Sequence, residues 1–79
     1  MRKITREEII AIVQDVKKTA NAASLRDEIK LEDQGLDSLD MFSIILRIQE
    51  NFAMEIPDSD IDKLDTMNNI IEYVNNRLL

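Results

Sequence analysis

Residues that interrupt helices are nearly absent from this chain. Glycine and proline each occur once in 79 residues, at Gly35 and Pro57, and only three residues are aromatic. Signals for β-strands are weak, whereas apolar residues recur at the spacing of a helix face. The sequence therefore predicts an all-α fold. Its length is typical of a single domain, spanning residues 1–79, with a small core.

Capping signals place the first helix. Thr5 is a good N-cap, Glu8 completes a capping box, and Ile4 can pack on Ile9 as a hydrophobic staple. The predicted apolar face of this helix consists of Ile9, Ile12, Val13, Val16 and Ala20. This extent would place Lys17 and Lys18 in the last turn, where cations favour the helix dipole.

Residues 21–36 show no clear period and predict a long ordered loop, which is unusual in a small domain and often functional. Gly35 closes it at a turn that tolerates positive φ. Four apolar residues could pin the loop to the core: Leu25, Ile29, Leu31 and Leu36.

A second helix is expected to begin near Asp37 or Ser38, with Asp37 as its cap and Asp40 in its first turn. Its apolar residues form more than one stripe, so it is either buried or has a second surface for a partner. They are Leu39, Met41, Phe42, Ile44, Ile45, Leu46, Ile48 and Phe52.

After Pro57, a short helical turn is expected over 58–64. Thr66 then caps a final helix with core residues Met67, Ile70, Ile71, Val74 and Leu78.

Composition limits the chemistry available to the chain. It contains no Cys and no His, so neither a thiolate metal site nor a Ser-His-Asp hydrolase can be assembled from it. We expect no catalytic residues and no metal site. No apolar run reaches the length of a membrane span, and the basic N-terminus does not lead into a signal-peptide core, so the expected compartment is the cytoplasm.

The net charge of −6 is unevenly distributed. Basic and acidic residues balance over 1–36, whereas 37–79 holds nine acidic and three basic residues. An acidic half disfavours nucleic acid and suits partners with basic docking patches. Alternatively, the charge serves only solubility.

Ser38 lies at the expected start of the second helix. The ordinary interpretation is a capping serine. As a nucleophile it lacks a base in this chain, but it could be the acceptor of a phosphodiester, because helix N-termini bind phosphate groups. Asp37 and Asp40 oppose such an anion, which suggests that they attract a cationic enzyme.

Asp58, Asp60 and Asp62 alternate like the start of a calcium loop. The sixth position is Lys63 instead of Gly, and the twelfth is Asn69 instead of a bidentate Glu. The sequence therefore argues against calcium binding.

The run Gly35-Leu36-Asp37-Ser38-Leu39-Asp40 resembles the modification motif of acyl carrier proteins. The likeness extends to Glu32-Asp33, to Phe52 with Glu55-Ile56-Pro57-Asp58, and to Thr66 with Ile70-Ile71-Glu72-Tyr73-Val74. It covers about Leu31 to Val74 without gaps, and Thr5 to Val16 fits the family's first helix.

This resemblance implies a small four-helix bundle that carries acyl groups as thioesters on a 4′-phosphopantetheine arm at Ser38. A phosphopantetheinyl transferase would attach the arm, and synthases, acyltransferases or ligases would use a monomeric carrier. Residues expected to line the core or an acyl cavity are Ile44, Ile45, Ile48, Phe52, Ile56, Ile61, Leu64 and Ile70. Residues expected to recognise partners are Asp37, Asp40, Phe42, Ser43, Leu46, Arg47, Glu50, Ile56, Asp58 and Asp62.

The second helix departs from the family pattern at Ser43, where a Glu is usual, and at Arg47 and Gln49, where acidic residues are common. Such charges act mainly on partner choice, so we expect a dedicated fatty acid, lipid or polyketide-type pathway. Neutral drift is the alternative. An unmodified helical interaction domain and an aminoacyl or peptidyl carrier also remain open.

Overall fold

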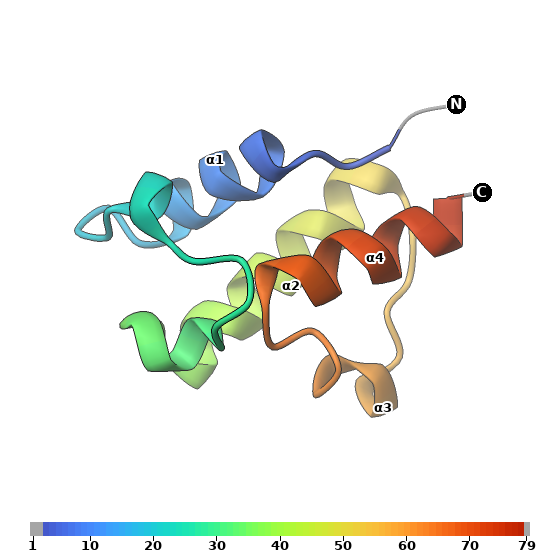
Figure 1. The fold of residues 1–79 in the computed structure, drawn as a ribbon. Helices are drawn as coiled ribbons and strands as arrows, with labels where there is room; N and C mark the ends of the chain where they lie inside the picture. The colour runs from blue at the N-terminus through green and yellow to red at the C-terminus, as the bar shows by residue number, and fades with distance from the viewer. Residues whose placement is uncertain (1–2, 79) are drawn as a thin grey trace.

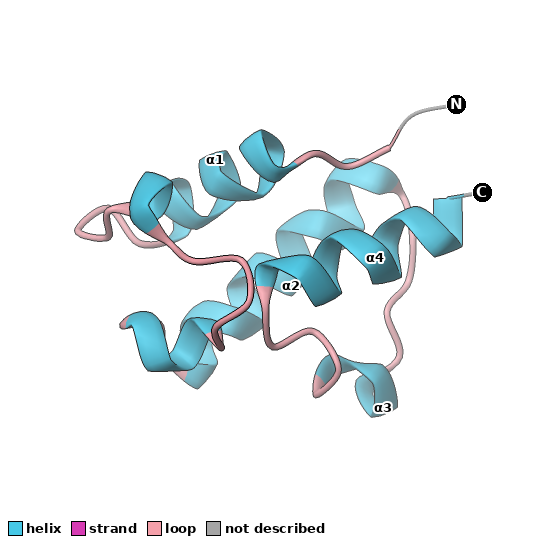
Figure 2. Ribbon diagram, in the orientation of Figure 1, coloured by secondary structure: helices cyan, strands magenta, loops and turns pink. Residues whose placement is uncertain are grey.

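The structure, a computed structural model, describes residues 3–78. Within this range helices are the only regular elements and there is no strand (Figures 1 and 2). The α-helices are α1 (Arg6–Val16), α2 (Ser38–Phe52), α3 (Asp58–Ile61) and α4 (Met67–Leu78), and two 3-10 helices, η1 (Ala22–Ser24) and η2 (Leu31–Gln34), lie in the long connection between α1 and α2. The predicted all-α fold with a long first connection and a short third helix is confirmed.

Local signals set the helix starts as expected. Thr5 Oγ1 accepts from the Glu8 amide at 3.3 Å, and Glu8 Oε1 accepts from the Thr5 amide at 3.3 Å. Thr66 Oγ1 likewise accepts from the Asn69 amide at 3.0 Å, so it caps α4. These bonds satisfy amides that a helix start otherwise leaves unpaired.

The predicted end of α1 is wrong. The helix stops at Val16, so Lys17 and Lys18 do not lie in its last turn and Ala20 is not on its apolar face. Gln14 stabilises the departing chain: its Nε2 donates to the carbonyls of Lys18 at 3.1 Å and Ala20 at 2.7 Å. A side chain reaching forward along the chain thus competes with continuation of the helix.

The loop between α1 and α2 is anchored on both polar and apolar contacts. Leu25, Leu31 and Leu36 are buried as expected, but Ile29 is 37% exposed and does not pin the loop. The Leu31 amide donates to the Asp65 carbonyl at 2.8 Å. The loop is therefore fixed against the segment that precedes α4.

Gln34 ties the loop to itself. Its Oε1 accepts from the Arg26 amide at 2.6 Å, and its Nε2 donates to the carbonyls of Arg26 and Ile29, both at 2.9 Å. These three bonds hold residues 26–34 of the loop together.

The helices enclose an apolar core. α1 packs on both α2 and α4, and the Ile4 amide donates to Asn75 Oδ1 at 2.9 Å, which joins the two ends of the described chain (Figure 1). Among residues 3–78 no polar or charged residue is buried. The buried residues are Ile4, Ile9, Ile12, Val13, Ala22, Leu25, Leu31, Leu36, Met41, Ile44, Ile45, Ile48, Ile56, Leu64, Met67, Ile70 and Val74.

Candidate functional site

Ser38 is the first residue of α2 and is exposed. The N-cap is Asp37: its Oδ1 accepts from the Asp40 amide at 2.8 Å, while Asp40 Oδ2 accepts from the Asp37 amide at 3.1 Å. The two carboxylates form a reciprocal capping box. Because Asp37 performs the capping, the ordinary explanation for a serine at this position does not apply to Ser38.

The backbone before Ser38 is held in one conformation. Gly35 has φ +99°, in the left-handed region that favours glycine, and ends η2. The Leu36 amide then donates to the Leu31 carbonyl at 3.3 Å, and the Leu36 side chain is buried. The motif therefore presents Ser38 from a fixed turn at the start of a helix.

A pocket of about 380 Å³ opens beside Ser38. Its apolar lining comes from Met41, Phe42 and Ile45 on α2, from Ile61 on α3 and from Leu64. Its polar lining is Lys30, Glu32, Asp62 and Asp65 together with Ser38. Ser38 therefore lines a pocket that has one apolar and one charged part.

The residues expected to line an acyl cavity divide into two groups. Ile45, Ile61 and Leu64 line the pocket beside Ser38. Ile44, Ile48 and Ile70 are fully buried in the core, and Phe52 is partly buried against it.

The apolar residues that α2 exposes are large. Leu39 is 72% exposed, Phe42 48% and Leu46 43%. The sequence predicts partner contacts for Phe42 and Leu46 but not for Leu39. Its spacing of three and seven residues from Phe42 and Leu46 is the signal that could have included it.

The other candidate recognition residues differ in accessibility. Asp37, Glu50, Asp58 and Asp62 are exposed, and Ser43 is half-buried. Ile56 is only 5% exposed and belongs to the core, so its burial does not support the expected partner contact.

Asp40 is engaged inside the molecule. Lys17 Nζ lies 3.0 Å from Asp40 Oδ2, and the Asp40 side chain is 18% exposed. The hydrogen bond from Lys17, followed by the one from the Asp37 amide, lowers the pKa of Asp40. Much of the negative charge expected to attract a partner here is therefore balanced by Lys17, the residue that follows α1.

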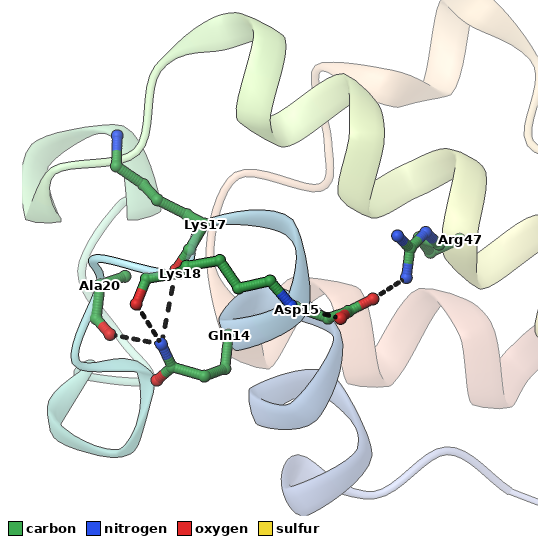
Figure 3. Close-up of polar contacts among 6 residues, drawn as sticks. All are labelled: Gln14, Asp15, Lys17, Lys18, Ala20 and Arg47. Atoms are coloured by element: carbon green, nitrogen blue, oxygen red, sulfur yellow. Dashed lines mark hydrogen bonds and ion pairs between the residues drawn. The ribbon is translucent and has the colours of Figure 1, made fainter.

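Arg47 is paired in the same way. Its guanidinium forms an ion pair with Asp15 on α1, and the other Asp15 oxygen lies 3.0 Å from Lys18 Nζ. Figure 3 shows Asp15 between these two cations, with Gln14 turned to the backbone after α1. Arg47 therefore links α2 to α1 rather than presenting an unpaired cation.

The Asp15 ion pair predicts an acid-dependent effect. Arg47, and then Lys18, lower the pKa of Asp15 to about 2. Because the folded pKa lies below the usual value, the pair stabilises the fold above about pH 4, and this contribution is lost as the pH falls towards 2. In Arg47→Gln, carboxyl NMR should show the Asp15 pKa moving up towards its usual value of 3.8. An unchanged pKa in Arg47→Gln would contradict the pairing, and Arg26→Gln serves as the exposed control.

No group of three or more metal-ligating side chains occurs among residues 3–78. Of the alternating aspartates Asp58, Asp60 and Asp62, Asp60 accepts hydrogen bonds from Tyr73 and Arg77 of α4. In the same part of the chain, no helix combines the length and the apolar character needed to cross a membrane.

Comparison with known proteins identifies a family model and several relatives that match this chain. The family model described as "Phosphopantetheine attachment site" matches residues 7–74. An acyl carrier protein of Campylobacter jejuni is 37% identical over 65 residues, covering 82% of this chain and 83% of the relative. That of Campylobacter lari is 38% identical over 74 residues, covering 85% and 96%. That of Wolinella succinogenes is 32% identical over 72 residues, covering 82% and 95%.

These matches cover more than four fifths of the chain, and the residues matched by the family model, 7–74, include the run Gly35–Asp40. They support a covalent 4′-phosphopantetheine and a role in carrying acyl groups rather than in catalysis. The chain belongs to the acyl carrier protein family.

Proposed function

We propose that Ser38 receives the phosphopantetheine arm, and that the chain presents acyl thioesters on this arm to the enzymes of a dedicated fatty acid, lipid or polyketide-type pathway. The observation that carries the proposal is the exposed Ser38, which does not cap the helix because Asp37 does, and which lines a pocket that also has an apolar wall. The arm supplies a terminal thiol that a chain without Cys does not have.

The surroundings of Ser38 act on a phosphodiester in two ways. The helix dipole at the start of α2 favours the group, whereas the Asp37 and Asp40 carboxylates oppose it, and Lys17 offsets part of their charge. The apolar side chains of Ile45, Ile61 and Leu64 could then shield an acyl chain from water, because burial of apolar surface is favourable.

Attachment of the arm is the direct test. The full chain would be incubated with coenzyme A, Mg²⁺ and a broad-specificity phosphopantetheinyl transferase, and its intact mass recorded. We expect one arm mass per chain, located on the peptide that contains Ser38. A chain that stays unmodified would instead support a helical interaction domain.

Partner recognition is proposed to use the exposed α2 surface around Ser38. Its apolar part consists of Leu39, Phe42 and Leu46, and exposed carboxylates lie at Asp37 and Glu50 and near α3 at Asp58 and Asp62. These carboxylates suit the basic docking patches expected on the transferase and on acyl-handling enzymes. Asp40 and Arg47 would contribute less, because each is already ion-paired within the chain.

The proposal of a dedicated pathway rests on Ser43. The family usually has a Glu at this position, which would add negative charge to the docking surface. We expect the holo protein to be loaded slowly by the malonyl transferase of general fatty acid synthesis. Ser43→Glu should raise kcat/KM of loading roughly three- to tenfold at low salt, because added charge steers association. The control is Asn76→Glu, which adds the same charge at an exposed position on α4. Efficient loading of the wild type would contradict the specialisation.

A further inference from the structure

α3 forms one wall of the pocket, and its own apolar anchoring is limited to Ile61, which is partly buried against the core. It has four residues, Asp58–Ile61, and none of them is buried. Ile61 is half-buried and lines the pocket. Asp62 and Leu64, just beyond the helix, also line it. The facing wall is α2, through Met41, Phe42 and Ile45. The width of the pocket therefore depends on what holds α3 in place.

The Asp60 carboxylate joins α3 to α4 by hydrogen bonds. Asp60 Oδ2 accepts from Tyr73 Oη at 2.6 Å and from an Arg77 guanidinium nitrogen at 3.0 Å. Its other oxygen accepts from Lys63 Nζ at 3.2 Å, a contact within its own segment. The Asp60 side chain is only 15% exposed, so these bonds are partly shielded from water.

Both partners are held in the state that forms the bond. The hydrogen bond from Tyr73, followed by that from Lys63, lowers the pKa of Asp60, which keeps it ionised. Burial, and then the bond to Asp60, raises the pKa of Tyr73, which keeps it protonated. Arg77 also lies over the Tyr73 ring, 5.0 Å from its centroid, and so fixes the ring that donates.

We propose that Asp60 is a positioning residue for the cargo. Its bonds to Tyr73 and Arg77 hold α3 against α4, and the position of α3 sets the length of the acyl chain that the pocket beside Ser38 admits. The statement about acyl chains rests on the proposed function, whereas the statement about α3 does not.

The position of α3 can be tested on the unmodified full chain. The amides of Lys63 and Leu64 donate to the carbonyls of Asp60 and Ile61, both at 3.0 Å, so their hydrogen exchange reports opening of this segment. In Tyr73→Phe, which keeps the ring and loses the donor, we expect their exchange to be about tenfold faster, since a hydrogen bond to a charged group is lost. Exchange in α1 and in the middle of α2 should be unchanged.

The matched control is Lys63→Ala, which removes an Asp60 contact that does not reach α4. Exchange at Leu64 should stay near the wild-type rate in this variant. Wild-type exchange in Tyr73→Phe, or an equal increase in both variants, would overturn the proposal. Asp60→Ala should show the largest increase, and Tyr73→Phe keeps the test decisive if Asp60→Ala does not fold.

The effect on cargo needs the acylated protein. Holo wild type and Tyr73→Phe would be loaded with saturated acyl chains of increasing length, and the methyl resonances of Ile45, Ile61 and Leu64 recorded. We expect the shifts to stop changing at a longer chain in Tyr73→Phe than in the wild type. The same limiting length in both would overturn the role in cargo selection. Failure of the arm to attach would appear in the mass and overturn the proposed function, while the exchange data still decide whether Asp60 holds α3.

Discussion

Ser38→Ala is expected to abolish arm attachment completely, with no gain of arm mass even after prolonged incubation with coenzyme A and transferase. The substitution removes the hydroxyl oxygen that would form the phosphodiester, so no residual rate is expected from this position. Because Ser38 is exposed and Asp37 is the N-cap, the fold should be unaffected. Circular dichroism and the urea midpoint would verify this.

Ser43→Ala is the matched control for this experiment. Ser43 is the other serine of α2 and lies one and a half turns further along the helix. The Ser43→Ala variant should accept one arm on Ser38 with wild-type yield. A change in its rate of modification would report a contact between Ser43 and the transferase. Arm mass on Ser38→Ala, or on a peptide without Ser38, would show that another residue is the acceptor.

Ile48→Ala is expected to cause the second large effect, through stability rather than chemistry. Ile48 is fully buried, and truncation of such a side chain costs about 2–5 kcal/mol from lost burial and the cavity left behind. A core in a chain this short rarely supplies more than roughly 3–5 kcal/mol in total. The variant should therefore be largely unfolded at 25 °C, as measured by urea denaturation followed by circular dichroism.

The control for this loss is Leu39→Ala on the same helix. Leu39 is 72% exposed, so its truncation should change the free energy of unfolding by less than about 0.5 kcal/mol. Equal destabilisation by the two substitutions would contradict the distinction between the buried and exposed faces of α2.

Helix positions could be predicted where the signal lies within one turn. The capping boxes at Thr5–Glu8 and at Asp37–Asp40 join residues three apart, so the sequence alone contains both partners. The end of α1 was predicted wrongly because the apolar spacing continues to Ala20, while Gln14 bonds to carbonyls of the departing chain. Periodicity does not report such competing bonds.

The candidate site, too, could be predicted only in part. The motif and its spacing pointed to Ser38, and the density of apolar residues on α2 indicated a second, exposed face. The sequence predicted less well which apolar residues are exposed. Ile29 was predicted to be buried, and Leu39 was not predicted to contact partners, yet both are exposed. Exposure depends on what the rest of the chain covers.

The helical class, the helix starts and the motif that contains Ser38 could be predicted, because each depends on neighbouring residues. The pairing of charged and polar side chains between distant segments depends instead on how the chain packs. Asp15 and Arg47 are 32 residues apart, Lys17 and Asp40 are 23 apart, and Asp60 and Tyr73 are 13 apart. Ion pairs and hydrogen bonds act over a few ångströms, so such partners meet only when the segments that carry them pack together.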